Sequence, residues 1–240
     1  MSLPPKPLRA FDMKVTVIHG QNHHGSTYHL AHSLAEKLGG EMTEFFLPKD
    51  FGDMCLGCTR CFMESEKKCP HYERLAPITA AMDEADVVIF DSPVYVFHVT
   101  GSMKAFLDHY GWRFMVHRPE EKMFTKQAVC ICTAAGGGMK HTLTDMTDTT
   151  FYWGFARTYK LGAAVRSTTW KGVDEKIKQK LDKKLDRIAN RIKKNCGHIR
   201  PKLPTRAFFF LMSRLQRKVF SPADAKYWQS KGWTEGKRPW

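Results

Sequence analysis

Five short apolar segments recur along the first two-thirds of the chain, separated by amphipathic stretches. Their length and their β-branched residues predict β-strands, which span residues 14–19, 41–47, 86–91, 127–133 and 158–165. Apolar residues spaced three and four apart predict helices in the stretches between and after them, at 27–38, 71–84, 102–109, 141–151 and 173–195. This alternation predicts an α/β fold, a doubly wound five-stranded parallel sheet with helices on both faces.

The loop after the first predicted strand is a candidate anion site, because ligands of such folds bind beyond the carboxyl ends of the strands. It contains Gln21, His23 and Gly25, and the helix that follows starts near Ser26 and Thr27. The first turn of a helix has N–H groups without partners and a positive dipole end. The loop contains no lysine and matches neither the Walker motif nor the three-glycine dinucleotide motif. We therefore expect it to hold a phosphomonoester rather than a nucleoside triphosphate.

The loops after the third and fourth predicted strands lie at the same edge of the predicted sheet. The former is an aromatic turn formed by Pro93, Val94, Tyr95, Val96 and Phe97. The latter is a small-residue loop formed by Thr133, Ala134, Ala135, Gly136, Gly137 and Gly138. A backbone without side chains can lie close against a flat ring. Each loop alone is compatible with an ordinary βα connection, but the three together predict a pocket for a phosphorylated planar heterocycle.

Three segments resemble the NAD(P)H-dependent FMN reductases of the flavodoxin-like superfamily: residues 20–27, residues 92–108 and the glycines at 136–138. The end of the chain, residues 227–233, is also similar to the last helix of that family. The resemblance implies FMN bound without a covalent link, with its phosphate in the first loop and its ring between the second and third loops. It implies an oxidoreductase that takes hydride from NAD(P)H. The flavin then carries the chemistry, and we expect no catalytic side chain.

The first loop departs from the family at His23, where members usually carry a cationic residue. An imidazole is mostly neutral at neutral pH unless a phosphate raises its pKa. If His23 is the charge partner of the phosphate, we expect FMN affinity to fall as the pH rises from about 6 to about 8. The alternative is that His23 is a solvated loop residue.

Four of the seven cysteines lie close together, at Cys55, Cys58, Cys61 and Cys69, and Pro70 follows the last one. The C-x2-C-x2-C-x7-C spacing is compatible with one iron–sulfur cluster. It resembles the compact motif of the iron–sulfur flavoproteins, in which a [4Fe-4S] cluster exchanges electrons with FMN. This resemblance implies an alternative function as an electron carrier. Zinc, a disulfide and free thiols are further uses of these four side chains.

The net positive charge of the chain comes from its last third, because basic and acidic residues balance in the rest. Residues 1–170 hold 18 basic and 18 acidic residues, whereas residues 171–240 hold 20 and 6, which accounts for the net charge of +14. We expect a leader at 1–12, a flavodoxin-like FMN-binding domain at 13–196 and a basic helical extension at 197–240. The leader has no apolar core of the kind found in signal peptides, so we expect a cytoplasmic protein.

The basic extension contains an aromatic segment at 206–220 for which three uses compete. Packing on a second subunit is favoured, because many exposed phenylalanines are a liability, and it predicts a homodimer or homotetramer. Docking of an acidic electron-transfer protein and contact with an anionic membrane surface are the alternatives. We do not expect nucleic-acid binding, since no reading motif accompanies the charge. The final electron acceptor, a small molecule or a protein, is left open.

Overall fold

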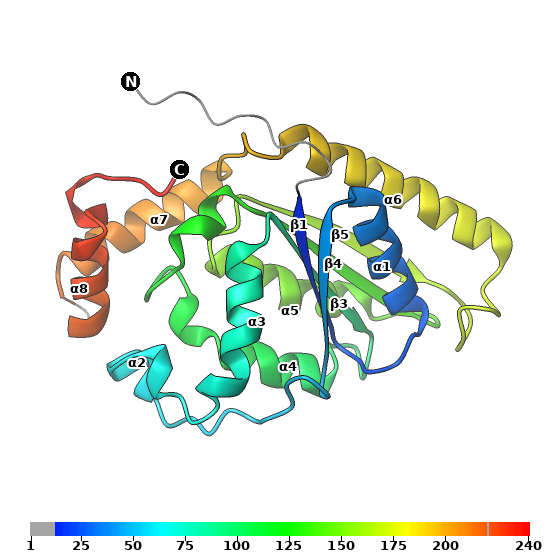
Figure 1. Cartoon of the computed structure of the whole chain (residues 1–240), viewed down its shortest axis with the longest axis horizontal. Helices are drawn as coiled ribbons and strands as arrows, with labels where there is room; N and C mark the ends of the chain where they lie inside the picture. The colour runs from blue at the N-terminus through cyan, green and yellow to red at the C-terminus, as the bar shows by residue number, and fades with distance from the viewer. Residues whose placement is uncertain (1–12, 220) are drawn as a thin grey trace.

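Five parallel strands form a single sheet in the order β2-β1-β3-β4-β5 (Figure 1). The structure is a computed structural model that describes residues 13–219 and 221–240; the expected leader at 1–12 lies outside the described residues. The strands are β1 Lys14–His19, β2 Glu41–Phe46, β3 Val87–Pro93, β4 Gln127–Ala134 and β5 Arg157–Ala164. All five predicted strands are therefore confirmed, with ends shifted by two residues at most. The winding reverses between β1 and β3, where such folds bind ligands.

Helices cover both faces of the sheet (Figure 1). On one face lie α1 Ser26–Leu38 and α6 Glu175–Asn195, and on the other lie α3 Tyr72–Glu84, α4 Gly101–Asp108 and α5 Met139–Tyr152. Alternate residues of β3 enter the two cores, with Val87 and Ile89 in one and Val88 and Phe90 in the other. This alternation follows from the two-residue period of a strand, and it gives the predicted three-layer architecture.

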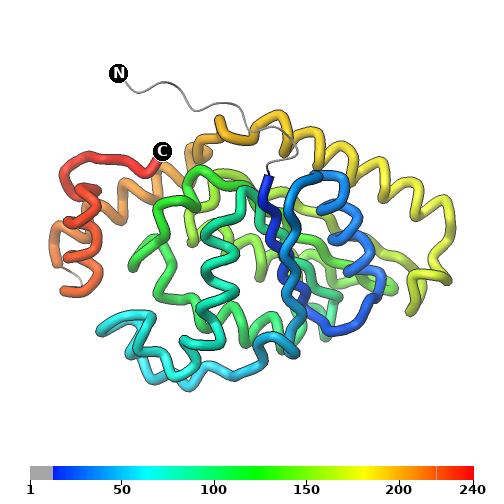
Figure 2. The backbone as a smooth tube through the Cα atoms, viewed as in Figure 1, coloured from blue at the N-terminus to red at the C-terminus, as the bar shows by residue number. Residues whose placement is uncertain are grey.

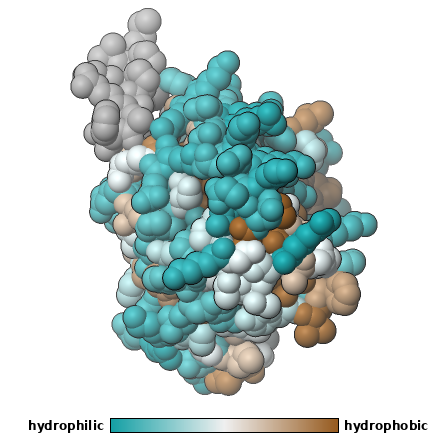
Figure 3. Space-filling view, turned by 90° about the vertical axis from the view of Figure 1, so that its right-hand side faces the viewer, coloured by the Kyte–Doolittle hydropathy of each residue, from teal (hydrophilic) through white to brown (hydrophobic). Residues whose placement is uncertain are grey.

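Helix α6 confirms the predicted amphipathic pattern. Its apolar residues at three- and four-residue spacing, Leu181, Leu185, Ile188 and Ile192, are buried against α1 and the sheet. Its lysines point outward, and the side of the molecule in Figure 3 is accordingly largely hydrophilic. No helix of residues 13–219 and 221–240 is long and apolar enough to cross a lipid bilayer.

The C-terminal extension forms two helices, α7 Leu203–Gln216 and α8 Pro222–Ser230, which lie at the opposite end of the molecule from α1 (Figures 1 and 2). They pack on the segment between α4 and β4 through a third apolar cluster of buried residues, which comprises Met115, Phe124, Phe209, Met212, Trp228 and Trp233. Part of the aromatic surface that was expected to require a second subunit is thus buried within the chain. Phe210, Leu211 and Leu215 of α7 remain exposed.

Asp224 of α8 connects the C-terminal extension to the rest of the chain through a buried carboxylate. Its buried carboxylate accepts a hydrogen bond from Arg118, and the other oxygen lies 2.8 Å from Nδ1 of His117. The Arg118 guanidinium also donates to the backbone carbonyls of Cys61 and Phe62. Both carbonyls belong to the long connection between β2 and α3, which contains the four clustered cysteines, the short helix α2 Arg60–Met63 and a 3-10 turn at Glu66–Lys68. One arginine therefore links the extension to the cysteine-bearing connection.

Candidate functional site

A pocket with a volume of about 240 Å³ opens at the carboxyl edge of the sheet. Eleven of the residues expected to bind the cofactor line it: Gln21, His23, Gly25, Ser26, Thr27, Pro93, Val94, Tyr95, Thr133, Ala134 and Ala135. The three loops that were expected to form one site therefore do meet at one edge. Val96, Phe97, Gly136, Gly137 and Gly138 are not among the lining residues. They belong to the same two loops, one to three residues beyond those that line the pocket.

The N-terminus of α1 forms one end of this pocket. No side chain caps the helix at Gly25, and its first turn carries no acidic residue. The first-turn N–H groups therefore stay available to an anion, and the helix dipole favours negative charge there. The hydroxyl of Thr27 lies 2.5 Å from that of Thr133 at the end of β4, which joins the first loop to the third. This end of the pocket can hold a phosphate.

Further hydrogen bonds join the start of the first loop to β3 and to the N-terminus of α4, the two elements that flank the aromatic turn. The backbone oxygen of Gly20 accepts from the hydroxyls of Thr100 at 2.6 Å and Ser102 at 2.9 Å. The Gly20 N–H donates to the backbone oxygen of Asp91 at 2.7 Å. A Cβ atom at position 20 would lie 2.8 Å from that same oxygen, so only glycine permits this close approach. The loops are thus held in a fixed arrangement by the chain itself.

The aromatic turn has an unusual backbone. Tyr95 and His98 exchange two backbone hydrogen bonds of 3.0 Å around Val96 and Phe97, whose φ angles are +49° and +68°. Positive φ angles are costly for residues with a side chain, above all for a β-branched one. The side chains of Val96 and Phe97 are 92% and 64% exposed, so burial in the chain does not compensate for the strain. A hydrogen bond of 2.9 Å between His98 Nδ1 and Asp145 Oδ2 helps to hold the turn. Strain of this kind is typical of binding sites.

The glycine loop packs directly beneath this turn. Gly138 has a φ angle of +91°, and a Cβ atom there would lie 2.7 Å from Cγ1 of Val94 and 3.1 Å from Cδ1 of Phe97. In contrast, a Cβ atom at Gly136 or Gly137 would meet nothing within 4 Å. Gly138 is therefore required by the packing of the chain, whereas Gly136 and Gly137 leave open space above the backbone.

A network of charged side chains lies beneath the pocket, and no local pattern in the sequence predicts it. Nδ1 of His19 lies 2.5 Å from Oδ2 of Asp91, a pocket-lining residue, and Nε2 lies 2.9 Å from Oε1 of Glu44. Burial alone would lower the pKa of His19, but its hydrogen bonds to the two carboxylates outweigh burial and raise that pKa. His32 lies 3.1 Å from the same Glu44 oxygen, which connects the network to the surface. Burial acts to raise the pKa of Glu44, yet hydrogen bonds from both histidines bring it below its usual value.

Sequence reasoning missed five lining residues: Tyr28, Asp91, Val165, Ser167 and Thr168. Tyr28 is the second residue of a predicted helix, and Asp91 is the last residue of a predicted strand. Residues 165–168 follow β5. This strand lies at the edge of the sheet, away from the switch point between β1 and β3 where such folds bind ligands. The one available signal is the acidic residue Asp91 at the end of the strand predicted at 86–91.

The four clustered cysteines lie on one connection. Cys55 and Cys58 are exposed, while Cys61 and Cys69 are half-buried. Burial raises the pKa of Cys61 to about 11, and the nearby thiols of Cys69, Cys55 and Cys58 contribute to the rise. Metal binding by these thiols would have to overcome the cost of ionising Cys61.

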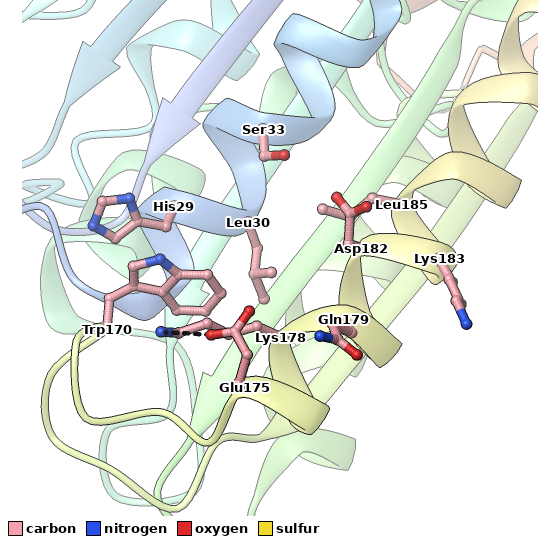
Figure 4. Close-up of a pocket in the computed structure, with 10 residues that line it drawn as sticks. All are labelled: His29, Leu30, Ser33, Trp170, Glu175, Lys178, Gln179, Asp182, Lys183 and Leu185. Carbon is pink, nitrogen blue, oxygen red and sulfur yellow. Dashed lines mark ion pairs between the residues drawn. The ribbon is translucent and has the colours of Figure 1, made fainter.

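A second cavity, of about 400 Å³, lies between α1 and α6 (Figure 4). His29 stacks on Trp170 with ring centroids 5.4 Å apart, and Lys178 lies 5.5 Å above the same indole. Lys178 also pairs with Glu175 at 3.5 Å, as the dashed line in Figure 4 shows. This cavity takes no residue from the three loops at the carboxyl edge, so it does not form part of the candidate site.

Comparison with known proteins finds similarity to a flavoprotein in sequence and to two oxidoreductases in fold. Over 90 residues the chain is 32% identical to an iron–sulfur flavoprotein of Archaeoglobus fulgidus, and the match covers 36% of this chain and 38% of that relative. The fold is similar to an NAD(P)H:quinone oxidoreductase from Methanothermobacter marburgensis, with a TM-score of 0.57, 13% identity and coverage of 76% of this chain and 98% of the other. It is also similar to an FMN-dependent NADH-azoreductase from Bacillus anthracis in complex with FMN, with a TM-score of 0.53, 13% identity and coverage of 75% and 99%.

The match to a protein family covers more of the chain than the match to the iron–sulfur flavoprotein. Residues 13–168 match the family described as NADPH-dependent FMN reductase, a range that spans β1 to β5 and all three loops of the pocket. This match confirms the expected membership of the FMN reductases, and the five-stranded parallel sheet agrees with the expected flavodoxin-like fold. The chain therefore belongs to the NADPH-dependent FMN reductase family.

Proposed function

We propose that this chain binds FMN in the pocket at the carboxyl edge and uses NAD(P)H to reduce a second substrate. The observation that supports the proposal is the meeting of three loops around one cavity: the N-terminus of α1, the turn after β3 and the end of β4. The residues fit the cofactor on physical grounds. An uncapped helix N-terminus suits a phosphate, and the neighbouring cavity is lined by Val94, Tyr95 and Ala134, which suit a planar apolar ring.

The residues of the chain have distinct roles in this proposal. The first-turn N–H groups and the hydroxyls of Ser26 and Thr27 bind the phosphate. Val94 and Tyr95 pack against the ring and exclude water, while the backbone of 133–138 offers hydrogen-bonding groups to the ring edge. When bound, FMN supplies a centre that accepts hydride from the nicotinamide and passes electrons on. The strained turn at Val96 and Phe97 presents exposed apolar side chains next to the pocket, where the nicotinamide or the acceptor approaches.

Binding of FMN and of riboflavin by single variants tests this assignment. Ser26→Ala and Thr27→Ala should each weaken FMN binding about tenfold, because each removes a hydrogen bond to a charged group. Riboflavin has no phosphate, so its binding should not change for Ser26→Ala, and it should change less than that of FMN for Thr27→Ala, which also loses the contact with Thr133. Thr144→Ala serves as the control, because Thr144 is an exposed helical threonine on α5. Failure of the purified wild-type chain to bind added FMN, or equal losses for FMN and riboflavin, would contradict the proposal.

Electron transfer through the cysteine-bearing connection is a second candidate function. The observations that favour it are the match to an iron–sulfur flavoprotein and the gathering of Cys55, Cys58, Cys61 and Cys69 on one connection. In that case the four thiolates would hold a [4Fe-4S] cluster. Anaerobic mixing with NADH, NADPH or reduced ferredoxin distinguishes the two candidates. Rapid flavin bleaching by a nicotinamide supports the reductase, whereas bleaching by ferredoxin alone supports the carrier.

The oligomeric state and the domain division are also proposals. We infer that the flavodoxin-like domain spans 13–196 and the extension 197–240, and that the chain forms a homodimer or homotetramer. Exposed apolar side chains on α7, Phe210, Leu211 and Leu215, support the second inference. Light scattering coupled to size-exclusion chromatography measures the state directly. A monomer at micromolar concentration would contradict it. The acceptor, a small molecule or an electron-transfer protein, is best identified by turnover with each class.

A further inference from the structure

Three side chains with metal-binding atoms meet outside the flavin pocket. Cys69, His71 and His109 each place one such atom within 4.8 Å of the other two. Nδ1 of His71 and Nε2 of His109 are 2.8 Å apart. In a tetrahedral zinc site with bonds of about 2.3 Å to sulfur and about 2.0 Å to nitrogen, one sulfur and two nitrogens lie roughly 3.3–3.5 Å from one another. A metal ion therefore fits among the three atoms after side-chain shifts of less than about 1 Å.

The backbone positions of these residues are fixed by two helix ends. His71 is the N-cap residue of α3, and its carbonyl accepts from the N–H of Leu75 at 3.1 Å. The Cys69 carbonyl accepts from the N–H of Tyr72 at 3.0 Å, so Cys69 and His71 lie on one hydrogen-bonded turn. His109 is the C-cap residue of α4, 38 residues further along the chain. The start of one helix and the end of another thus converge on the same point.

The orientation of His109 is set for metal binding. Its Nδ1 lies 2.7 Å from the backbone oxygen of Ala105, and a carbonyl can only accept, so Nδ1 carries the hydrogen. This leaves a lone pair on Nε2, which faces His71. Metal-bound histidines commonly donate their other N–H in this way, which fixes both tautomer and ring orientation. In the metal-free chain, Nδ1–H of His71 donates to that lone pair, and a metal ion would replace this hydrogen.

The three residues differ in how far they are buried. His109 is buried, and the ring of Phe51 packs edge-on against it with centroids 4.8 Å apart. Cys69 and His71 are half-buried, which leaves a path from solvent to the ligand atoms. A site with one buried ligand, two accessible ones and an apolar wall can both order its ligands and admit an ion.

We propose that Cys69, His71 and His109 form a binding site for one divalent transition-metal ion of the zinc class. One thiolate and two imidazoles suit zinc, and cobalt as its spectroscopic substitute. Three protein ligands leave a fourth position for water or an external ligand. The site would join the connection between β2 and α3 to the end of α4. It also assigns Cys69 to a different partner set from Cys55, Cys58 and Cys61, so that the site competes with a four-cysteine cluster for Cys69.

Cobalt titration of the chelator-treated full-length chain tests the proposal. We expect one Co²⁺ per chain, a thiolate-to-cobalt absorption band, and displacement of cobalt by Zn²⁺. His71→Gln and His109→Gln should each weaken binding at least tenfold, since the loss of a ligand exceeds the 10- to 100-fold effect of losing an outer partner. Cys69→Ser should abolish the absorption band. His198→Gln, at an exposed histidine, is the matched control and should bind as the wild type does.

A triple variant separates this site from a four-cysteine site. Cys55→Ser, Cys58→Ser and Cys61→Ser together should leave cobalt binding unchanged if the proposal holds. Loss of binding in the triple variant, with normal binding in both histidine variants, would overturn it. Because His109 is buried and its variant could unfold, the half-buried His71 provides the independent test, with circular dichroism as the measure of folding. The titration needs no flavin, so its result is independent of whether FMN binds.

Discussion

Nδ1 of His19 at the end of β1 lies 2.5 Å from Oδ2 of Asp91 near the end of β3, at the base of the pocket. The second ring nitrogen of His19 lies 2.9 Å from Glu44 on β2. Both nitrogens face carboxylate oxygens, which only accept when ionised, so the arrangement favours a protonated imidazole. The network joins three adjacent strands at the edge where the cofactor is proposed to bind.

This network predicts a pH-dependent stability. The carboxylates of Asp91 and Glu44 raise the pKa of His19 in the folded state above its ordinary value of 6.5, against the effect of burial. The stabilisation from His19 is therefore full below about pH 6.5 and is lost as the pH rises through the folded-state pKa. His19→Gln should remove this dependence and lower the free energy of unfolding by about 3 kcal/mol at pH 6, because the buried carboxylate of Asp91 loses its partner.

Urea denaturation between pH 6 and pH 9 provides the measurement for His19. His198→Gln, at an exposed position, should reproduce the wild-type profile. If His19→Gln kept the wild-type slope of stability against pH, the inference that His19 is protonated in the folded protein would be wrong.

The glycine loop offers a matched pair of substitutions. Gly138→Ala combines a φ angle of +91° with a Cβ atom 2.7 Å from Val94, so it should lower the free energy of unfolding by about 2 kcal/mol. Gly137→Ala meets open space in the chain and should change stability by less than about 0.5 kcal/mol. If the FMN ring lies against this backbone, Gly137→Ala should still weaken FMN binding. Thermal unfolding and flavin fluorescence titration read the two effects separately.

Relief of the strained turn should stabilise the protein. A two-residue turn with positive φ angles at both positions prefers Asn-Gly, whereas this chain has Val96 and Phe97. The double variant Val96→Asn, Phe97→Gly should raise the free energy of unfolding by about 1–2 kcal/mol. It also removes two exposed apolar side chains next to the pocket, so KM for the nicotinamide should rise. A variant with unchanged stability would mean that the turn is not strained.

Asp224 should be essential for the attachment of the C-terminal extension. Asp224→Asn weakens a buried interaction with Arg118 and His117, and it should cost about 3 kcal/mol of stability. Asp182→Asn breaks a surface ion pair with Lys37 and should cost less than about 1 kcal/mol. Calorimetry would show one transition for the wild type if extension and body unfold together. Equal effects of the two variants would contradict the proposed role of Asp224.

The role of His23 can be tested by restoring a permanent charge. His23 lines the pocket, and its neighbour His24 does not. If His23 pairs with the phosphate of FMN, wild-type affinity should fall as the pH rises from about 6 to about 8. His23→Arg should give tighter binding and a flatter profile, because an arginine stays charged, whereas His24→Arg should follow the wild type. The ionisation of the phosphate itself is common to all three proteins, and identical profiles would exclude His23 as the charge partner.

Local patterns in the sequence were sufficient to predict the five strands, the parallel sheet and the buried face of α6. Each depends on a period of two or of three to four residues, which neighbouring positions determine by themselves. The meeting of Ser26, Tyr95 and Thr133 at one pocket was also predictable, because parallel strands bring their carboxyl ends to one edge whatever the details of packing. The resemblance of the same loops to the FMN reductases indicated FMN as the expected cofactor.

Only the tertiary structure revealed the contacts between residues that share no local pattern. His19 and Asp91 are 72 positions apart, Arg118 and Asp224 are 106 apart, and His71 and His109 are 38 apart. The aromatic residues of α7 were expected to face a second subunit, yet Phe209 packs on Phe124 of its own chain, with ring centroids 5.3 Å apart. Such pairings depend on how helices and loops pack once the sheet has formed, and that packing is fixed by shape and burial across the whole molecule rather than by neighbours in the sequence.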